Sequence, residues 1–351
     1  MHTKCSIRSF SKISDGLRIA FFGTDSFSVE ALSRVIASGK RNPGMISSLD
    51  VITRSIKPQG RKREFVDVPI GIYAGNHNIS IHRADTNKEI MDITSEIGPN
   101  MAIAVSYGKL IPAELLNNLK FGGLNVHPSL LPKYSGSSPI QYTLMNDDKK
   151  TGVTVQTLHP SKFDRGAIIA QSEEQNIEET DNYHTLLNKL GIIGSDLLVE
   201  VLEKQLYLQS HTNIEHSNYE FSLAPKILPS ASQIKWDEHT NRQIKRLNDA
   251  LGPLHTFKRC NLLRKKKSIE ELHKVILEDI GSCNSIYDRK EPGTFHSGTG
   301  NDNNQLIVHT KEGAVSVGKI KMQYCSYEDP ITFMSNIQKR SGNTDLKFSI
   351  N

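Results

Sequence analysis

A strand, helix, strand pattern constrains the fold of this chain more than any other feature of its sequence. Residues 100–108 and 123–126 are short apolar runs bounded by turn-forming residues, which is typical of buried strands. The segment 112–120 between them has helical spacing and a proline near its start. Residues 18–25 repeat the strand and turn and lead into helical spacing over 29–36. We therefore predict an α/β fold with an open, mostly parallel, Rossmann-like sheet and helices on both faces.

Polar side chains gather where one of these predicted strands ends. Asn125 and His127 are two residues apart, so in an extended segment they point to the same side. The prolines and glycines that follow predict an irregular loop rather than a helix. Sites in such sheets lie at the carboxyl ends of the strands, which is also where Gly23 and Gly108 fall.

An amide, an imidazole and a carboxylate are sufficient for an acyl transfer that uses no cysteine or serine nucleophile. Asn125 could stabilise an oxyanion, His127 could move a proton, and Asp164 could orient the histidine. Each residue alone would more often be a cap, a turn former or a structural histidine. The three together favour a catalytic centre. The thirteen histidines and four cysteines show no metal-binding spacing, so we expect no metal and ordinary reduced thiols.

Several motifs resemble those of the folate-dependent formyltransferases and, over nearly the whole chain, their branch that acts on methionyl-tRNA. The matching segments are 19–24, 105–112, 124–132, 136–141 and 151–154, together with Asp164 and Gly166. The resemblance implies that 10-formyltetrahydrofolate donates the formyl group and that initiator Met-tRNA accepts it. It assigns catalysis to Asn125, His127 and Asp164. It also implies that folate is bound by Ser129, Leu130, Leu131, Pro132 and Gly108.

Two departures from the family pattern concern the surroundings of the predicted site. The family has a second aspartate and a glycine ahead of its catalytic aspartate. Here that stretch is one residue longer, and His159 stands in place of the first aspartate. Ser135 occupies a position where bacterial members commonly have arginine. We expect the loop that lines the folate pocket to be shaped differently in this chain.

The length of 351 residues fits two domains. We expect a catalytic domain over 18–222, a linker over 223–240, an OB-like β-barrel that binds tRNA over 241–337, and a loose polar tail over 338–351. The barrel is suggested by a helical segment at 240–252 and short strands at 273–278, 293–296, 305–310 and 314–321, separated by turns rich in glycine and asparagine.

Local basic clusters suggest where a nucleic acid could bind, although the whole chain carries only 43 Lys and Arg against 38 Asp and Glu. One cluster, which includes Lys258 and Arg259, lies at the start of the predicted barrel, and the other corresponds to the family's loop that meets the acceptor arm of tRNA. Solvated surface loops are the alternative. The residues that we expect to bind tRNA are Arg61, Lys62, Arg63, Lys265, Lys266 and Lys267.

The first seventeen residues differ from the rest, with several bases and serines and no acid before Asp15. This composition suits a mitochondrial presequence and predicts location in the matrix, with a disordered basic tail as the alternative. The chain has no apolar stretch long enough to cross a bilayer, so we expect no membrane insertion.

Two other functions compete with formylation of initiator Met-tRNA. The first is a formyltransferase that acts on a small amine, such as a sugar-nucleotide or ribonucleotide amine, and the basic clusters and presequence argue against it. The second is a non-catalytic RNA-binding protein on the same fold, and the intact Asn125, His127 and Asp164 argue against that. The tRNA-directed relatives suggest a monomer.

Overall fold

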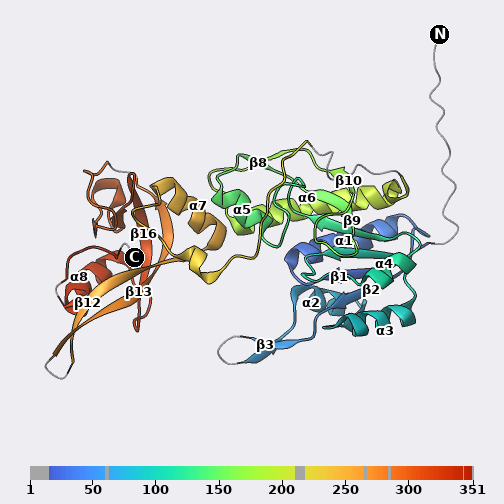
Figure 1. The fold of residues 1–351 in the computed structure, drawn as a ribbon, viewed down its shortest axis with the longest axis horizontal. Helices are drawn as coiled ribbons and strands as arrows, with labels where there is room; N and C mark the ends of the chain where they lie inside the picture. The colour runs from blue at the N-terminus through green and yellow to red at the C-terminus, as the bar shows by residue number, and fades with distance from the viewer. Residues whose placement is uncertain are drawn as a thin grey trace, which may run out of the picture. The chain divides into compact units, whose positions relative to one another are not determined.

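The computed structural model describes residues 16–59, 63–209, 218–264, 267–283, 286–342 and 344–349 (Figure 1). Its residues form two compact units. The N-terminal unit comprises the chain up to Gly136, with 152–174 and 187–223, and the C-terminal unit comprises 137–151, 175–186 and the residues from Ala224 onward. Two segments that precede residue 222 therefore belong to the C-terminal unit, which differs from a single boundary after that residue. Helix α5 (Pro139–Met145) accounts for one of them, because it packs against helix α7 (Asn241–Leu251).

A seven-stranded sheet forms the centre of the N-terminal unit, in the order β10-β9-β7-β6-β1-β2-β5. Five neighbouring strands are parallel, and at one edge β9 pairs antiparallel with β7 and β10 pairs antiparallel with β9. The predicted mostly parallel sheet is confirmed. The strands are β1 (Leu17–Gly23), β2 (Ile46–Thr53), β5 (Ser80–Arg83), β6 (Met101–Val105), β7 (Gly123–His127), β9 (Thr154–Thr157) and β10 (Ile168–Gln171).

Helices cover both faces of this sheet (Figure 1). On one face, apolar side chains of α3 and α4 pack against Ala20 and Phe22 of β1 in a single buried cluster. On the other face, Gly194 of α6 lies against Val126 of β7 and Phe27 of α1, where a larger residue would have no room. The helices of this unit are α1 (Ser26–Arg41), α2 (Pro69–Asn76), α3 (Asn87–Ile97), α4 (Ala113–Asn118) and the larger part of α6 (Tyr183–Glu203).

Local sequence signals explain where these helices begin and end. Asp25 caps α1 by accepting a hydrogen bond from the Ser28 backbone N–H at 3.1 Å. Thr86 and Glu89 form a reciprocal capping box at the start of α3, and Gly98 ends that helix in the left-handed conformation. Because α1 begins directly after β1, the chain turns at the carboxyl end of the sheet, where the predicted site lies.

The C-terminal unit is built on a five-stranded antiparallel sheet in the order β12-β13-β16-β15-β14, consistent with the predicted small barrel. The predicted strands are present, but the sheet starts earlier, with a long hairpin of β12 and β13. Helix α8 (Pro330–Ser341), which we did not predict, also packs on it. The strands are β12 (Leu254–Arg264), β13 (Lys267–Ser282), β14 (Phe295–Ser297), β15 (Leu306–His309) and β16 (Ala314–Met322).

The C-terminal segment is packed rather than loose, in contrast to the tail expected over 338–351. Phe348 is buried, with its ring 4.5 Å from that of Phe295 and 5.7 Å from that of Trp236, measured between centroids. Its backbone N–H donates to Gly293 O at 2.9 Å, and the next N–H donates to Phe257 O at 2.7 Å. The end of the chain therefore completes the core of this unit.

The short elements complete the inventory. They are β3 (Lys57–Gln59), β4 (Glu64–Val66), β8 (Lys150–Thr151), β11 (Gln175–Asn176), and the 3₁₀ turns at Leu206–Leu208, Pro229–Ser232 and Gly300–Asp302. Among the described residues, no helix has both the length and the apolar character needed to span a membrane.

Candidate active site

Two antiparallel strands place the predicted catalytic side chains on one face of the sheet. Strand β7 pairs with β9 so that Asn125 lies opposite Gln156 and His127 lies opposite Thr154. Residues two apart on a strand share a face, so the two β7 side chains and their β9 partners line the same side. Asp164 comes from the loop that joins β9 to β10 and has a left-handed backbone, with φ of 51°.

The carboxylate of Asp164 is the meeting point of this group. Its Oδ1 accepts hydrogen bonds from Asn125 Nδ2 at 3.3 Å and Gln156 Nε2 at 3.2 Å, and it lies 3.3 Å from His127 Nδ1. Its Oδ2 accepts a hydrogen bond from the Gly136 backbone N–H at 2.8 Å. An ionised carboxylate, which accepts on both oxygens, satisfies all of these donors. The structure thus brings Asn125, His127 and Asp164 together as predicted.

His127 is 5% exposed, and both of its ring nitrogens face oxygen atoms. Nε2 lies 2.9 Å from the backbone carbonyl of Tyr134, opposite the contact of Nδ1 with Asp164. These two contacts fix the plane of the ring and direct Nδ1 at the Asp164 carboxylate.

Residues 129–132 form a buried turn directly after β7. Ser129 Oγ donates to Lys133 O at 2.6 Å, and the Leu131 N–H donates to Thr154 Oγ at 3.0 Å. The same Thr154 hydroxyl donates to Ser129 O at 2.7 Å, so β9 fastens the turn from both sides. The side chains of Ser129, Leu130, Leu131 and Pro132 are buried. These side chains therefore pack inside the unit and fix the path of the turn.

The exposed Gly108, the other predicted folate contact, follows β6 with φ of +76°. Nearby, Thr24 Oγ donates to Ser106 O at 2.5 Å and ties the ends of β1 and β6 together. Burial raises the pKa of Asp25 from its ordinary value and is opposed by the hydrogen bonds that this carboxyl accepts. Burial also raises the pKa of Tyr107 to about 12, so this phenol stays protonated at physiological pH.

Comparison with known proteins shows which family the chain belongs to. The Formyl transferase family model matches residues 17–202. The chain belongs to this family. It is 30% identical to "Methionyl-tRNA formyltransferase, mitochondrial" of Saccharomyces cerevisiae over 372 aligned residues, which cover 93% of this chain and 90% of the yeast protein.

Solved structures with low identity share the fold of this formyltransferase. HypX from Aquifex aeolicus in complex with tetrahydrofolic acid has a TM-score of 0.57 at 14% identity, covering 93% of this chain and 48% of HypX. The N-formyltransferase from Helicobacter canadensis, in complex with folinic acid and dTDP-3-aminofucose, has a TM-score of 0.55 at 15% identity. The match covers 86% of this chain and 98% of that protein.

Hydrogen bonds to His159 stabilise the loop that carries Asp164. His159 Nδ1 accepts hydrogen bonds from the backbone N–H groups of Ser161 and Lys162, both at 3.1 Å. An acceptor at the start of a turn is the role that an aspartate side chain commonly plays. The histidine therefore supports the longer loop by the same kind of contact.

Ser135 is buried and also has a structural environment. Its Oγ donates to Pro132 O at 3.1 Å, and its backbone N–H donates to Ser222 O at 2.9 Å. These two hydrogen bonds hold the chain in place just after the 129–132 turn.

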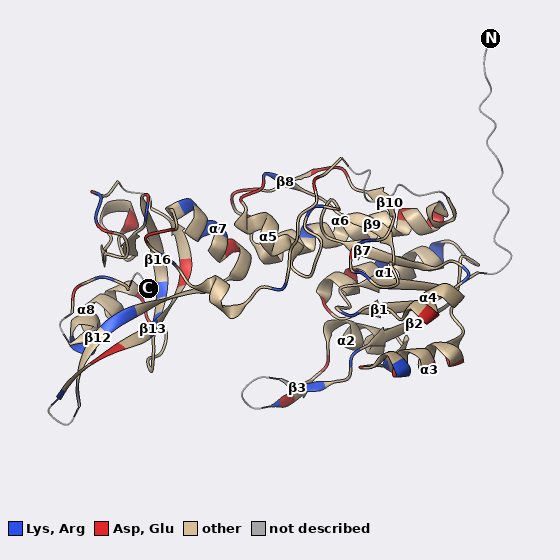
Figure 2. Ribbon diagram, viewed as in Figure 1, with Lys and Arg blue, Asp and Glu red and all other residues tan. Residues whose placement is uncertain are grey.

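The predicted tRNA-binding residues are only partly described. Arg61, Lys62, Lys265 and Lys266 lie outside the described residues. Arg63 and Lys267 are exposed, and basic residues lie along β3 and β12 in Figure 2. Lys258, however, is buried within the C-terminal unit, and its Nζ donates to Thr344 Oγ at 2.6 Å and Arg259 O at 3.0 Å. Lys258, a member of the basic cluster that was not among the residues expected to bind tRNA, therefore supports the packing of the C-terminal segment.

The hairpin of β3 and β4 is fixed at its base by one arginine. The Arg83 guanidinium makes two hydrogen bonds to the Asp67 carboxylate, at 2.8 and 2.6 Å, and a third to Arg54 O at 3.2 Å. Because Arg54 precedes the hairpin and Asp67 follows it, this single side chain holds both ends. The hairpin also carries Phe65, which is 76% exposed. We refer to Arg83 and Asp67 below as the hairpin clamp.

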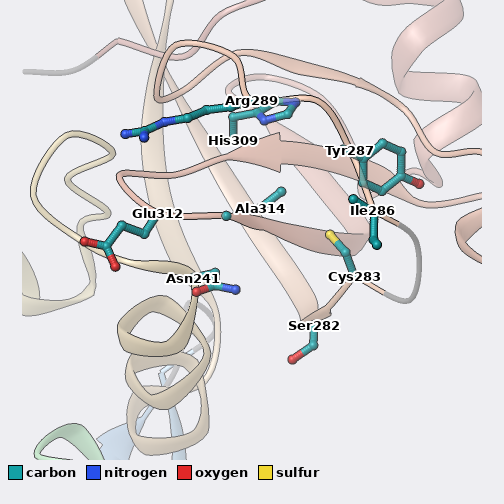
Figure 3. Close-up of a pocket in the computed structure, with 10 residues that line it drawn as sticks. Asn241, Ser282, Cys283, Ile286, Tyr287, Arg289, His309, Glu312 and Ala314 are labelled. Carbon is teal, nitrogen blue, oxygen red and sulfur yellow. The ribbon is translucent and has the colours of Figure 1, made fainter.

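The described part of the chain contains no group of three or more His, Cys, Asp or Glu side chains placed to bind a metal. A separate cavity of about 410 Å³ lies in the C-terminal unit and is lined by Cys283, Tyr287, Arg289 and His309 (Figure 3). Burial raises the pKa of Cys283 to about 11, so it is a neutral thiol rather than a nucleophile at physiological pH. None of the predicted site residues lines this cavity.

Three members of the site escaped sequence reasoning: the Gln156 side chain, the Gly136 N–H and the Tyr134 carbonyl. The two backbone groups carry no signature in the residue type. Gln156 had a weak signal, because residues 153–156 alternate apolar and polar character downstream of the recognised Asn-x-His strand.

Proposed function

We propose that this formyltransferase transfers the formyl group of 10-formyltetrahydrofolate to the α-amine of methionine esterified to initiator tRNA. One observation carries the proposal: Asn125 and His127 converge on the Asp164 carboxylate at the carboxyl end of the sheet. Support for the acceptor comes from the 30% identity with the yeast mitochondrial methionyl-tRNA enzyme over nearly the full length of both chains.

The proposal gives the three side chains distinct roles. Attack of the amine on the formyl carbon forms a tetrahedral oxyanion. Asn125 uses one N–H on Asp164 and has a second N–H available for this oxyanion. His127, oriented by Asp164 and helped by its carboxylate, takes the proton that the attacking amine loses. It passes this proton to the leaving N10 of the folate, so the formyl C–N10 bond breaks once the new C–N bond to the amine has formed.

The binding roles belong to the same proposal. The backbone of the 129–132 turn and of Gly108 would contact the folate cosubstrate. Exposed bases at Arg63 and Lys267, with their sequence neighbours Arg61, Lys62, Lys265 and Lys266, would contact tRNA phosphates. No metal takes part. The enzyme would act as a monomer in the mitochondrial matrix, to which residues 1–17 would direct it, in the initiation of translation.

A parallel acceptor assay tests the proposal. The full chain is supplied with 10-formyltetrahydrofolate and, separately, with initiator Met-tRNA, free methionine and glycinamide ribonucleotide. We expect formyl transfer to Met-tRNA only. Transfer to glycinamide ribonucleotide alone would identify a small-amine formyltransferase. Binding of tRNA without transfer to any acceptor would indicate the non-catalytic alternative.

A further inference from the structure

Gln156 bridges the catalytic carboxylate and the backbone that carries it. The side chain is 1% exposed and lies on β9 directly opposite Asn125. Its Nε2 donates to Asp164 Oδ1 at 3.2 Å, and its Oε1 accepts a hydrogen bond from the Gly166 backbone N–H at 3.1 Å. The orientation of the amide is determined by these partners, because only the oxygen can accept from an N–H and only the nitrogen can donate to a carboxylate.

The backbone around Asp164 explains why such a bridge is needed. A left-handed φ of 51° is disfavoured for a residue other than glycine, so neighbouring contacts must hold Asp164 in place. Two residues later the chain passes so close to β9 that a Cβ on Gly166 would lie 1.6 Å from Thr157 O. The loop therefore returns to the sheet at one defined point, and Gln156 binds both that point and the carboxylate.

The other contacts of Asp164 leave one oxygen in need of a permanent partner. The Gly136 N–H holds Oδ2. Asn125 donates to Oδ1 in the resting site, but in the proposed reaction its amide also serves the oxyanion. Gln156 has both of its polar groups engaged inside the site, so it can keep Oδ1 directed at His127 Nδ1 throughout the reaction.

We propose that Gln156 is a positioning residue for formyl transfer, which acts by holding Asp164 Oδ1 toward His127. This inference rests on the proposed function to the extent that Asp164 and His127 must be catalytic. Gln156 contacts Asp164 and the Gly166 backbone, and it acts on the reaction through Asp164. Its loss should therefore reduce the rate of the chemical step and leave substrate binding largely unchanged.

The test compares Gln156→Leu with Thr157→Val in steady-state kinetics on the full chain. Thr157 Oγ accepts a hydrogen bond from the Ala167 N–H at 2.8 Å, so it closes the same loop without touching Asp164. We expect kcat of Gln156→Leu to fall about tenfold to hundredfold, with both KM values within about threefold of wild type, because small misplacement of a catalytic group has effects of this size. Thr157→Val should keep kcat within about threefold.

A pH profile of Gln156→Glu separates positioning from general packing. The titratable group in contact with position 156 is Asp164 of the loop, which in turn contacts His127. On the neighbouring strands, the uncharged Asn125 of β7 and Ile168 of β10 lie opposite position 156. A protonated glutamic acid can donate to Asp164 Oδ1 in place of the amide, whereas an ionised one repels it. We expect kcat of this variant, relative to wild type, to rise as the pH is lowered from 8 to 6.

Two results would overturn the inference. One is a wild-type kcat in Gln156→Leu, and the other is an equal loss of kcat in Gln156→Leu and Thr157→Val, which would assign the effect to loop closure. Crystal structures of both variants provide a readout that does not depend on the acceptor. The distance from Asp164 to His127 Nδ1, 3.3 Å in the wild type, should lengthen only in Gln156→Leu. Failure of the wild-type enzyme to formylate Met-tRNA would count against the proposed function and leave this structural test valid.

Discussion

Replacement of Asp147 by Asn should destabilise the C-terminal unit, because this carboxylate pairs with two arginines of α7. Arg242 donates to it through Nη2 at 2.6 Å and Nε at 3.0 Å, and Arg246 donates through Nε at 2.9 Å. Arg246 is only 2% exposed, so its charge depends on protein partners. The substitution keeps the shape of the side chain and removes the negative charge that α7 requires.

The expected loss in the free energy of unfolding is about 2 kcal/mol. Removal of one partner from a fully buried pair costs about 3–5 kcal/mol. The Asp147 side chain is 33% exposed, which weakens the pair. Arg246 also keeps Asp249 at 3.3 Å and Glu179 at 3.5 Å, and Arg242 keeps Glu179. Because these partners remain, the expected loss of unfolding free energy is about 2 kcal/mol and not the full cost for a buried pair.

The loss should depend on pH in a defined direction. The hydrogen bonds from Arg242, and then those from Arg246, hold the pKa of Asp147 well below its ordinary value of 3.8. A carboxyl whose pKa is lowered by folding contributes stability above its unfolded pKa, near 4, and loses that contribution as the pH falls toward its folded pKa. The difference between wild type and Asp147→Asn should therefore be full at pH 7 and shrink below pH 4.

Urea unfolding followed by tryptophan fluorescence measures the free energy of unfolding of the C-terminal unit. The chain has a single tryptophan, Trp236, and it is buried in the core of the C-terminal unit. Glu238→Gln is a matched control, because it breaks an exposed pair with Lys235 and should change the free energy by less than about 0.5 kcal/mol. The reasoning would be refuted if Asp147→Asn lowered the free energy of unfolding by less than about 0.5 kcal/mol. It would also be refuted if the difference between wild type and variant were the same at pH 3 as at pH 7.

Three further predictions concern the site and its substrates. His127→Ala should lower the single-turnover rate constant of formylation at least about 100-fold while folate still binds. A near-normal rate constant would exclude a catalytic role for His127. Arg83→Ala should release the hairpin clamp and raise KM for Met-tRNA several-fold with an unchanged KM for folate; equal rises in both would indicate general damage. Combined alanine substitution of the basic residues at the β12–β13 turn should weaken tRNA binding, measured by filter binding, and reduce its salt slope by about 1 per lost phosphate contact. Unchanged affinity would make that turn a solvated surface. The substituted residues are Lys265, Lys266 and Lys267.

The central parallel strands could be predicted from sequence because their pattern is local. Strands buried on both faces appear as continuous apolar runs, as at β6 and β7. Strand β12 lacked such a run, since Lys258 interrupts it and one of its hydrogen-bond partners is Thr344, 86 residues away. The packing of Phe348 against Trp236 likewise depends on a contact across more than 100 residues. Periodicity within one segment carries no information about such partners.

The sequence could likewise predict some members of the catalytic group and not others. Asn125 and His127 were predictable because two polar residues two apart on a strand share a face. The link of His127 to the Tyr134 carbonyl was not, because it depends on a left-handed backbone at Tyr134, with φ of 60°, and on no side-chain chemistry. Gln156 required the register between β7 and β9, which the sequence does not state.

The longer loop before Asp164 shows how a catalytic position can persist while its surroundings change. The residues that fix the aspartate lie outside the insertion: Gln156 on β9, Gly136 after the 129–132 turn, and Gly166 at the point where the loop rejoins the sheet. Within the insertion, His159 satisfies the turn by accepting from two backbone N–H groups. Length and residue type can therefore vary between residues 158 and 163 without moving the carboxylate, whereas a side chain at position 166 would displace it. A Gly166→Ala variant should consequently lose formyl transfer. Deletion of one residue from the segment 158–163 in the same variant should not restore it. Activity in either variant would show that the loop itself, and not the point where it rejoins the sheet at Gly166, positions Asp164.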